Sequence, residues 1–332
     1  MASHACFKEG ITDQMKRTTH LLAAVAATAL LAAGCSSDDS KGSDKASGDG
    51  GSKTVKIGFI TKFPVDFYDT MVDAAKEWDS SESGAEVVFA QGKSGTDDEG
   101  EIAAIQSFVT QQVDAIVITP TSPNVQDDLQ KAVDAGIKVI LVDNDIPDWD
   151  GKTSVVATDN KAGGELAGKW LAENLPAGSK IAVLQGVLGN PSLDDRVTGM
   201  EDALGGAAEV VAKTPTDCDQ TKGLDAAQDI LTANPDIAGI YAACGPPLLG
   251  ALEAIDSAGL SGKLITVGFD ASPDELTAIA GGTESGSVAQ FPAKMGTMGV
   301  QAALDAINGK DVPPSIDTGT EMVTKDNVDQ FQ

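Results

Sequence analysis

AIVITPTSPNVQDDLQKAVDAGIKVILVD, residues 115–143, contains the clearest architectural signal in the chain. It begins and ends with short apolar runs, AIVIT and KVILVD, that are rich in β-branched residues. Between them lies a segment of helical period, which Ser122 and Pro123 begin and Gly136 ends. Because the two runs are too continuous for half-exposed strands, they predict parallel strands covered by helices on both faces.

The same alternation continues outward in both directions. Upstream, TVKIGFIT (54–61) precedes an amphipathic segment, and downstream the pattern restarts after TSVVATDNKAGG. KIAVLQG (180–186), IAGIYAAC (237–244) and KLITVGFD (263–270) then alternate with helical segments. The chain has 332 residues, of which 42% are hydrophobic, so it can form two substantial cores. The pattern predicts two doubly wound α/β units in tandem.

Ligands of such sheets bind at the carboxyl ends of the strands. Polar or sulfur-containing side chains stand at those ends, at Thr61, Gln91, Thr119, Asp143, Gln185, Cys244 and Asp270.

Composition argues against several functions. The formal net charge of −27 disfavours nucleic acid and anionic membrane surfaces as partners, although acidity also serves solubility. The two histidines, His4 and His20, both precede Cys35, so removal of the first 34 residues leaves none. Histidine-dependent nucleophilic catalysis and histidine-containing zinc sites are then excluded. We expect no catalytic residues, no metal and no cofactor.

The front of the chain predicts export. Residues 15–35, MKRTTHLLAAVAATALLAAGC, combine two cations with an apolar run that is short for a bilayer span. This arrangement is typical of a secretory signal peptide, here residues 1–34. Met15 is a natural start, which would make residues 1–14 an over-extension.

The end of this segment, LAAGC, resembles the lipobox of bacterial lipoproteins, in which the cysteine is lipidated and becomes the new N-terminus. Cys35 is therefore the expected lipid anchor, and an ordinary signal peptide with an incidental cysteine is the alternative. Residues 36–53 are almost devoid of apolar side chains, so residues 35–53 are interpreted as the lipidated cysteine and a flexible linker.

Beyond the linker, residues 54–323 resemble the ribose-type periplasmic sugar-binding proteins, the type I solute-binding proteins of ABC importers. The matching motifs include VITPTSPNV, VVATDNKAGG, VLQGVLGNPSLDDRVTGM, GFDASPDE and VAQFPAKMG. The resemblance implies two lobes joined by three crossovers. It divides the chain into an N-terminal lobe of 54–158 plus 291–319 and a C-terminal lobe of 159–290 plus 320–332.

The resemblance also implies a site between the lobes. Aromatic side chains there would stack on the apolar face of a sugar, and carboxylates would accept hydrogen bonds from adjacent hydroxyls. Arg196, the single arginine after Cys35, would donate through its planar fork in a geometry that lysine cannot reproduce. The alternatives are core packing for the aromatics, helix caps for the aspartates and an exposed ion pair for the arginine. The implied ligand-binding residues are Phe67, Tyr68, Asp143, Asn144, Arg196, Cys244, Asp270 and Gln290.

Four positions depart from the ribose-binding pattern. Asn144 stands in place of an arginine, Cys244 in place of an asparagine, Cys218 in place of an aromatic residue and Val65 in place of an asparagine. These departures disfavour ribose and predict a ligand of different stereochemistry or a smaller polyol. Because Cys218 and Cys244 replace site residues of the same lobe, in an oxidising compartment, we expect them to form a disulfide.

The leading hypothesis is a monomeric, membrane-anchored lipoprotein outside the cytoplasm that delivers a monosaccharide or sugar alcohol to an ABC permease. The alternative is a sensory protein that shares the fold but presents its closed form to a chemoreceptor or sensor kinase. A transcription-regulator core of the same fold is disfavoured by the export signal. An exported hydrolase would need Asp143 and Asp270 as acid and base.

Overall fold

The computed structural model describes residues 54–81 and 85–332. The predicted signal peptide, the lipidated Cys35 and the linker to residue 53 lie outside these described residues. In the part of the chain that is described, no helix combines the length and apolar character needed to cross a bilayer.

The first lobe is built on a six-stranded sheet in the order β11-β5-β4-β3-β1-β2, in which every pair is parallel. Every residue of β3 is buried, and in β4 only the first residue is exposed. The prediction from the two apolar runs is therefore confirmed. The strands are β1 (Val55–Thr61), β2 (Ala85–Gln91), β3 (Ala115–Ile118), β4 (Lys138–Val142), β5 (Ser154–Ala157) and β11 (Ser315–Asp317).

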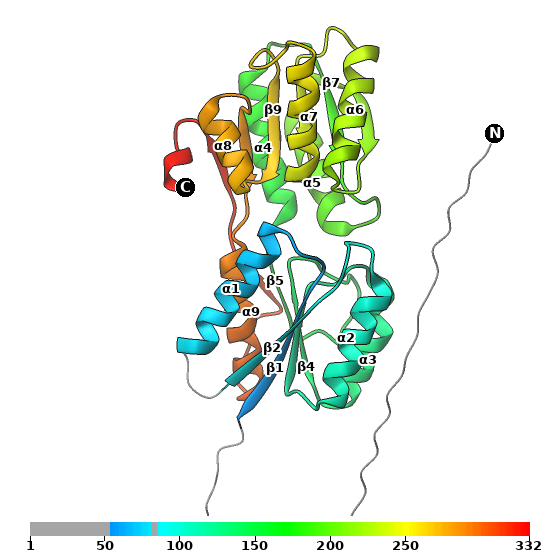
Figure 1. The fold of residues 1–332 in the computed structure, drawn as a ribbon, viewed down its shortest axis with the longest axis vertical. Helices are drawn as coiled ribbons and strands as arrows, with labels where there is room; N and C mark the ends of the chain where they lie inside the picture. Colours follow the sequence, from blue (N-terminus) through cyan, green and yellow to red (C-terminus); the bar gives the residue numbers. More distant parts are fainter. Residues whose placement is uncertain (1–53, 82–84) are drawn as a thin grey trace, which may run out of the picture. The chain divides into compact units, whose positions relative to one another are not determined.

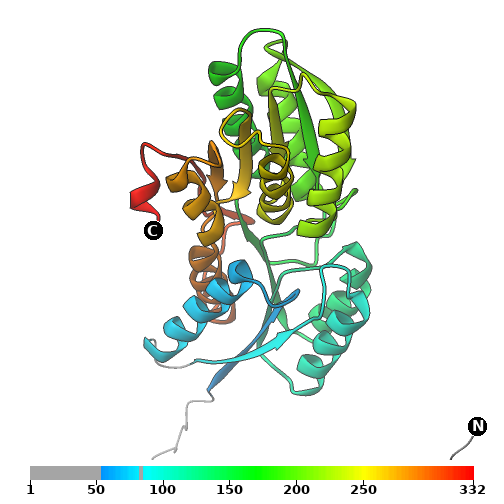
Figure 2. The ribbon, with the colours of Figure 1, turned by 45° about the horizontal axis from the view of Figure 1, so that its top comes forward.

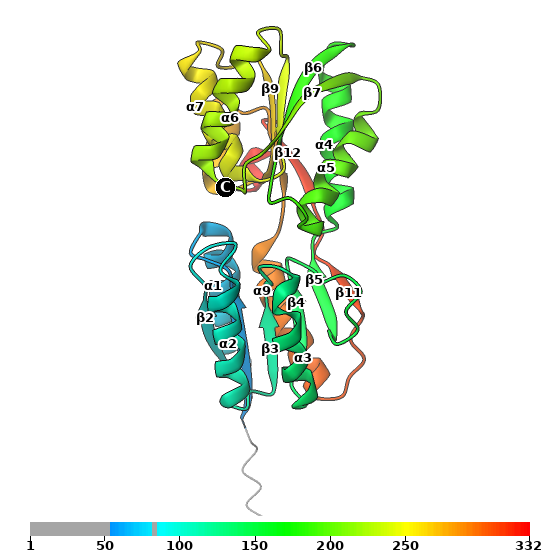
Figure 3. The same ribbon diagram turned by 90° about the vertical axis from the view of Figure 1, so that its right-hand side faces the viewer.

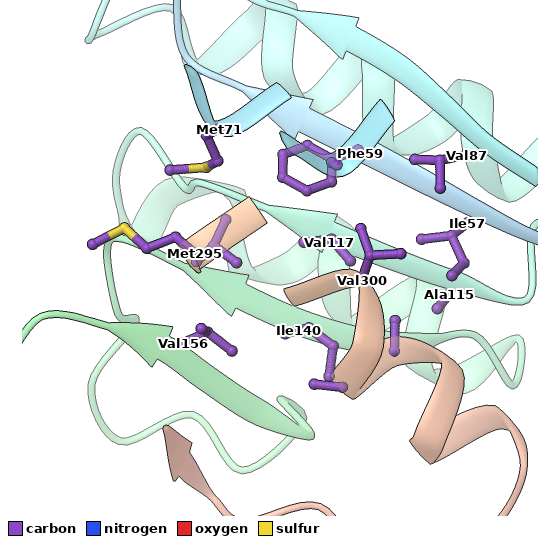
Figure 4. Close-up of a cluster of buried hydrophobic side chains, with 14 of the residues drawn as sticks. Ile57, Phe59, Met71, Val87, Ala115, Val117, Ile140, Val156, Met295 and Val300 are labelled. Atoms are coloured by element: carbon purple, nitrogen blue, oxygen red, sulfur yellow. The ribbon is translucent and has the colours of Figure 1, made fainter. Parts of the chain in front are cut away.

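Helices cover both faces of this sheet. α2 (Asp98–Thr110) and α3 (Gln126–Asp134) pack together on one face, and α1 (Asp66–Ser81) and α9 (Pro292–Ile307) on the other. Figure 1 shows α9, in orange, in the same lobe as the blue α1, although 210 residues of chain separate them. In Figure 4, Val300 of α9 lies over the same core as Phe59. The chain thus returns to complete the first lobe.

The second lobe contains a sheet in the order β12-β10-β9-β8-β6-β7, parallel except for the pairing of β12 with β10. Figure 3 shows α4 and α5 on one face of this sheet and α6 and α7 on the other. In Figure 2 the red C-terminal turn, η2, lies beside the orange helix α8, which it contacts. The elements are β6 (Ser179–Gln185), β7 (Ala208–Pro215), β8 (Gly239–Ala242), β9 (Ile265–Asp270), β10 (Gly286–Ala289), β12 (Glu321–Thr324), α4 (Asn160–Asn174), α5 (Pro191–Leu204), α6 (Gln220–Ala233), α7 (Gly245–Ser257), α8 (Pro273–Gly281) and η2 (Val328–Gln330).

Three connections join the lobes. They run from β5 to α4 through residues 158–159, from β10 to α9 through 290–291, and from β11 to β12 through 318–320. The predicted fold class, two doubly wound lobes with three crossovers, is confirmed.

One helix begins differently from the prediction. Ser122 caps a short 3-10 helix, η1 (Pro123–Val125), by accepting a hydrogen bond from the amide of Asn124, and α3 begins only at Gln126. Ser272, by contrast, caps α8 with a full capping box.

Candidate functional site

Two aspartates lie at the carboxyl ends of equivalent strands in the two lobes. Asp143 directly follows β4, and Asp270 is the last residue of β9. Their backbone φ angles are both positive, 65° and 102°. Aspartate tolerates this region better than most residues, yet it remains unusual outside glycine. Such conformations persist where the surrounding structure holds them, and they concentrate at functional sites.

Arg196 is the centre of the second-lobe half of the site. Its side chain is 4% exposed and lies 3.9 Å above the ring centre of Phe269. Nε donates to Oδ1 of Asn160 at 2.8 Å, and Nη1 donates to the Ala243 carbonyl at 2.9 Å and to Oδ1 of Asp270 at 3.3 Å. The guanidinium is therefore fixed by stacking and by hydrogen bonds from two of its nitrogens. An exposed surface pair, the alternative considered from sequence, does not describe it.

Glycines on α4 and α5 set the position of this arginine. A Cβ atom at Gly164 would lie 2.2 Å from the carbonyl oxygen of Arg196, and one at Gly199 would lie 2.2 Å from that of Lys161. Only glycine permits so close an approach of two helix backbones. Gly164, the second glycine of NKAGG, and Gly199 thus serve the helix packing that carries Arg196 to the strand ends.

Asp270 is surrounded by donors. Gln290 Nε2 donates to its Oδ1 at 2.7 Å, and the Gly245 amide donates to its Oδ2 at 3.2 Å. Burial raises the pKa of Asp270, while Arg196 and the Gln290 hydrogen bond act in the opposite direction. Oε1 of Gln290 is buried and has no hydrogen-bond partner within the described residues. This oxygen can accept one hydrogen bond from a bound molecule.

The first-lobe half of the site is aromatic. Tyr68 is 7% exposed, and its hydroxyl donates to Oδ2 of Asp143 at 3.2 Å. Burial, together with Asp143, raises the pKa of the phenol, so Tyr68 stays a neutral donor. Phe63 and Phe67 each meet the Tyr68 ring edge-on, with ring centres 5.4 Å and 5.3 Å away. Phe67 also packs against the first-lobe core, so core packing and ligand stacking both remain open for it.

Lys62 was missed by the sequence analysis. It follows the last residue of β1, is 7% exposed, and donates from its ammonium to Oδ1 of Asn144. Burial lowers the pKa of Lys62, and Asp143 opposes this shift. The substitution of Asn144 for an arginine suggested that this half of the site had lost its cation. The structure instead supplies a positive charge there from another strand.

The two halves lie within reach of each other. Nδ2 of Asn144, in the first lobe, donates to Oγ of Ser192, in the second, at 3.2 Å. Asp143 raises the pKa of Asp270 across the lobes, and Arg196 lowers that of Lys62. Charges of both lobes therefore act on one common region.

A disulfide joins Cys218 and Cys244 in the structure, with their Cα atoms 5.7 Å apart. Cys244 is 3% exposed and precedes α7, whose first residue, Gly245, donates its amide to Asp270. The sulfur bridge is therefore next to the site backbone, whereas neither sulfur makes a hydrogen bond to the other site residues described above.

The assembled groups favour a ligand with many hydroxyls. Asp143, Asp270 and Gln290 offer acceptors, whereas Lys62 and Arg196 offer charged donors. Two carboxylates and two cations leave this set without net charge. Within residues 54–81 and 85–332, no cluster of three or more histidine, cysteine or acidic side chains is arranged to hold a metal ion.

Known proteins share this architecture. The family model described as periplasmic binding protein domain matches residues 57–311. The ribose import binding protein RbsB of Bacillus subtilis is 32% identical over 250 residues, 75% of this chain and 80% of the relative. The fructose import binding protein FruE of Bifidobacterium longum is 30% identical over 312 residues, 91% of this chain and 92% of the relative.

A solved structure agrees with these relatives. A solute-binding protein of an ABC transporter from Bacillus halodurans, crystallised with myo-inositol, is 27% identical and superimposes with a TM-score of 0.80. The match covers 85% of this chain and 98% of that protein.

Proposed function

The chain belongs to the periplasmic binding protein family, a family of binding proteins rather than enzymes, and from this premise we propose that it captures a monosaccharide or sugar alcohol outside the cytoplasm and delivers it to an ABC permease. One observation carries the proposal. Asp143 and Asp270 end strands of different lobes, and each is held with acceptor oxygens beside a cation or phenol. A vicinal diol offers the two donors that a carboxylate can accept together.

The proposed mechanism is closure without chemistry. The sugar lies between the lobes, so it gains its full set of contacts only when both halves of the site meet. Tyr68 and Asp143 act from the first lobe, Arg196 and Asp270 from the second, and Gln290 from a connection. Asn144 lies on the first lobe and Cys244 beside Asp270, where each would line the ligand. Phe67 would stack on the apolar face of the sugar ring.

A thermal-shift screen of pentoses, hexoses and sugar alcohols tests this function. A ligand at one hundred times its Kd stabilises the folded protein by about 2.7 kcal/mol, which raises the melting temperature by a readily measured amount. We expect one or a few compounds to do so. A flat profile across the whole panel at millimolar concentrations would contradict sugar binding.

Membrane attachment through Cys35 is part of the proposal. LAAGC and the short apolar run before it support lipidation, and the linker would hold the two lobes away from the bilayer. In cells, Cys35→Ala should move the protein from the membrane fraction to the medium. Retention of this variant in the membrane fraction would refute the anchor.

The Cys218–Cys244 disulfide is proposed for the exported protein. The geometry of the two Cα atoms suits such a bond, and an oxidising compartment preserves it. Alkylation of the unreduced, unfolded protein should leave both cysteines unmodified. Two modified cysteines would show that the bond is absent.

Transport is distinguished from sensing by uptake. Deletion of the gene should abolish import of the radiolabelled sugar that the screen identifies, and we expect a monomer to be sufficient. Normal uptake with a lost chemotactic or transcriptional response would favour the sensory role.

A further inference from the structure

We propose that Lys62 is a ligand-contacting residue that selects among neutral sugars, a role that rests on the proposed sugar-binding function. Its ammonium would donate to one ligand hydroxyl while it keeps its hydrogen bond to Asn144. Lys62 would thereby be the adjustable donor of the first lobe, opposite the fixed donor Arg196 of the second.

The backbone directs this lysine into the site. Lys62 leaves β1 at its carboxyl end, where Thr61 accepts a hydrogen bond from the amide of Gly92. A Cβ atom at Gly92 would lie 2.5 Å from the carbonyl oxygen of Lys62, so only glycine lets the two loops touch. Contacts with Gly92 thus fix the chain after β1, with Lys62 buried at the strand ends.

Burial of the Lys62 ammonium is energetically unfavourable. A buried lysine loses its hydration and must recover it from partners. The hydrogen bond to Asn144 uses one of three N–H donors, and that partner is a neutral amide. The nearby carboxylates Asp143 and Glu101 act on Lys62 electrostatically. A hydroxylated ligand would satisfy a donor that these contacts leave.

Glu101 is a second buried carboxyl that acts electrostatically on Lys62. Both the amide and the hydroxyl of Thr121 donate to its Oε2, and its Oε1 is buried with no hydrogen-bond partner in the described part of the chain. Burial raises the pKa of Glu101 to about 7, so this carboxyl carries part of a charge at neutral pH. Within the described residues the ammonium of Lys62 donates only to Asn144, so Glu101 acts on it through charge and takes none of its remaining N–H donors.

Lys62 also orients Asn144. Because Oδ1 of Asn144 accepts from the ammonium, its Nδ2 points to Oγ of Ser192 in the other lobe. Loss of the lysine could therefore act through Asn144 alone. A test must separate this positioning effect from direct contact with the sugar.

The experiment compares Lys62→Met with Lys56→Met. Lys56 lies on β1, the strand that Lys62 follows, and its ammonium donates to the amide oxygen of Gln111 at an exposed position, so it is a matched control. Calorimetry measures binding of D-ribose, D-allose, D-arabinose, D-fructose, D-fucose, D-tagatose and myo-inositol. For the tightest binder of the wild-type protein, Lys62→Met should weaken Kd 10- to 100-fold and Lys56→Met less than twofold.

Monodeoxy analogues of that tightest binder provide the second arm. One analogue should bind the wild-type protein at least tenfold more weakly than the parent sugar does. Lys62→Met should bind that analogue and the parent sugar with about equal affinity. If every deoxygenation has equal effects in the two proteins, Lys62 only positions Asn144 and the proposal fails. Lys62→Gln serves as the second variant where Lys62→Met does not fold.

The outcomes distinguish the role of Lys62 from the proposed sugar-binding function on which it rests. A wild-type protein that binds a sugar, with unchanged affinity in a folded Lys62 variant, contradicts the inference alone. A wild-type protein that binds none of the seven compounds contradicts both.

Discussion

The two halves of the site hold their cations differently. The guanidinium of Arg196, in the second lobe, is fixed by several contacts, whereas the ammonium of Lys62, in the first lobe, ends a flexible side chain. Arg196 is stacked on Phe269 and donates to three protein acceptors, one of which is Asp270. Lys62 has four rotatable side-chain bonds and a hydrogen bond to one amide. A preorganised half lowers the entropic cost of binding, and an adjustable half can follow hydroxyls of different stereochemistry. We therefore propose that affinity comes mainly from the second lobe and selectivity mainly from the first.

The largest expected effect concerns the second-lobe half of the site. Arg196→Met removes the guanidinium and leaves Asp270 partly buried without its cation. The free energy of unfolding should fall by about 3–5 kcal/mol, as measured by urea denaturation. Lys161→Met, which breaks the exposed pair with Asp202, is the control and should change little. Equal stability of the two variants would show that the second lobe does not depend on this arginine.

Substitutions in the second lobe should also weaken sugar binding more than substitutions in the first. Asp270→Asn should weaken binding of the identified sugar by about 2–4 kcal/mol, because the variant loses a charged acceptor and leaves Arg196 without its partner. Asp143→Asn should have a smaller effect, about 1–2 kcal/mol, because its hydrogen-bond partner Tyr68 is neutral and its effect on Lys62 is electrostatic, without a hydrogen bond. Calorimetry of both variants measures the difference. A larger loss at Asp143 would reverse the comparison.

Stability should also depend on pH through the second lobe. Burial raises the pKa of Glu275, which lies behind Asp270, to about 8. Because the folded protein keeps a proton that the unfolded chain releases near pH 4.5, stability falls as pH rises from about 4.5 to 8. The free energy of unfolding should drop by roughly 2 kcal/mol between pH 6 and pH 8.

Glu275→Gln should reduce this dependence, and the exposed Glu253→Gln should retain it in full. Burial also raises the pKa of Glu284 in the same lobe, so that carboxyl keeps part of the dependence in Glu275→Gln. Denaturant titrations at the two pH values provide the measurement. An unchanged slope in Glu275→Gln would place the proton elsewhere, for example on Glu101 of the first lobe, whose pKa burial raises to about 7.

The smallest effect is expected at the aromatic edge of the first lobe. Phe67→Leu should reduce sugar affinity by about 1 kcal/mol through loss of stacking, with Phe331→Leu in the second lobe as a control. If Phe67 serves the core alone, the variant should lower the melting temperature and leave Kd unchanged. Paired calorimetry and thermal unfolding distinguish these results.

The alternation of strands and helices could be predicted from the sequence because its hydrophobic periodicity is strong. The runs AIVI and VILV had to be buried on both faces, and they are separated by the Ser122-capped η1 and by α3. The return of α9 to the first lobe could not come from periodicity, because an amphipathic helix does not specify which sheet it covers. That feature followed from the resemblance to known binding proteins.

The site was predicted unevenly, and the reason is physical. Asp143 and Asp270 stand at strand ends, and Arg196 was conspicuous as the single arginine after Cys35, so each had a local signal. Lys62 had none, because a lysine after a strand usually lies in solvent. Its burial depends on Gly92, thirty residues away, and on Asn144, more than eighty residues away. Such contacts belong to the tertiary structure.

The most direct test of the account is a crystal structure with the tightest-binding sugar of the thermal-shift screen. We predict one sugar molecule that donates hydroxyl hydrogen bonds to the carboxylates of both Asp143 and Asp270, with Arg196 on one side and Lys62 on the other. A sugar that contacts the side chains of one lobe only, or that lies away from these strand ends, would contradict the central claim.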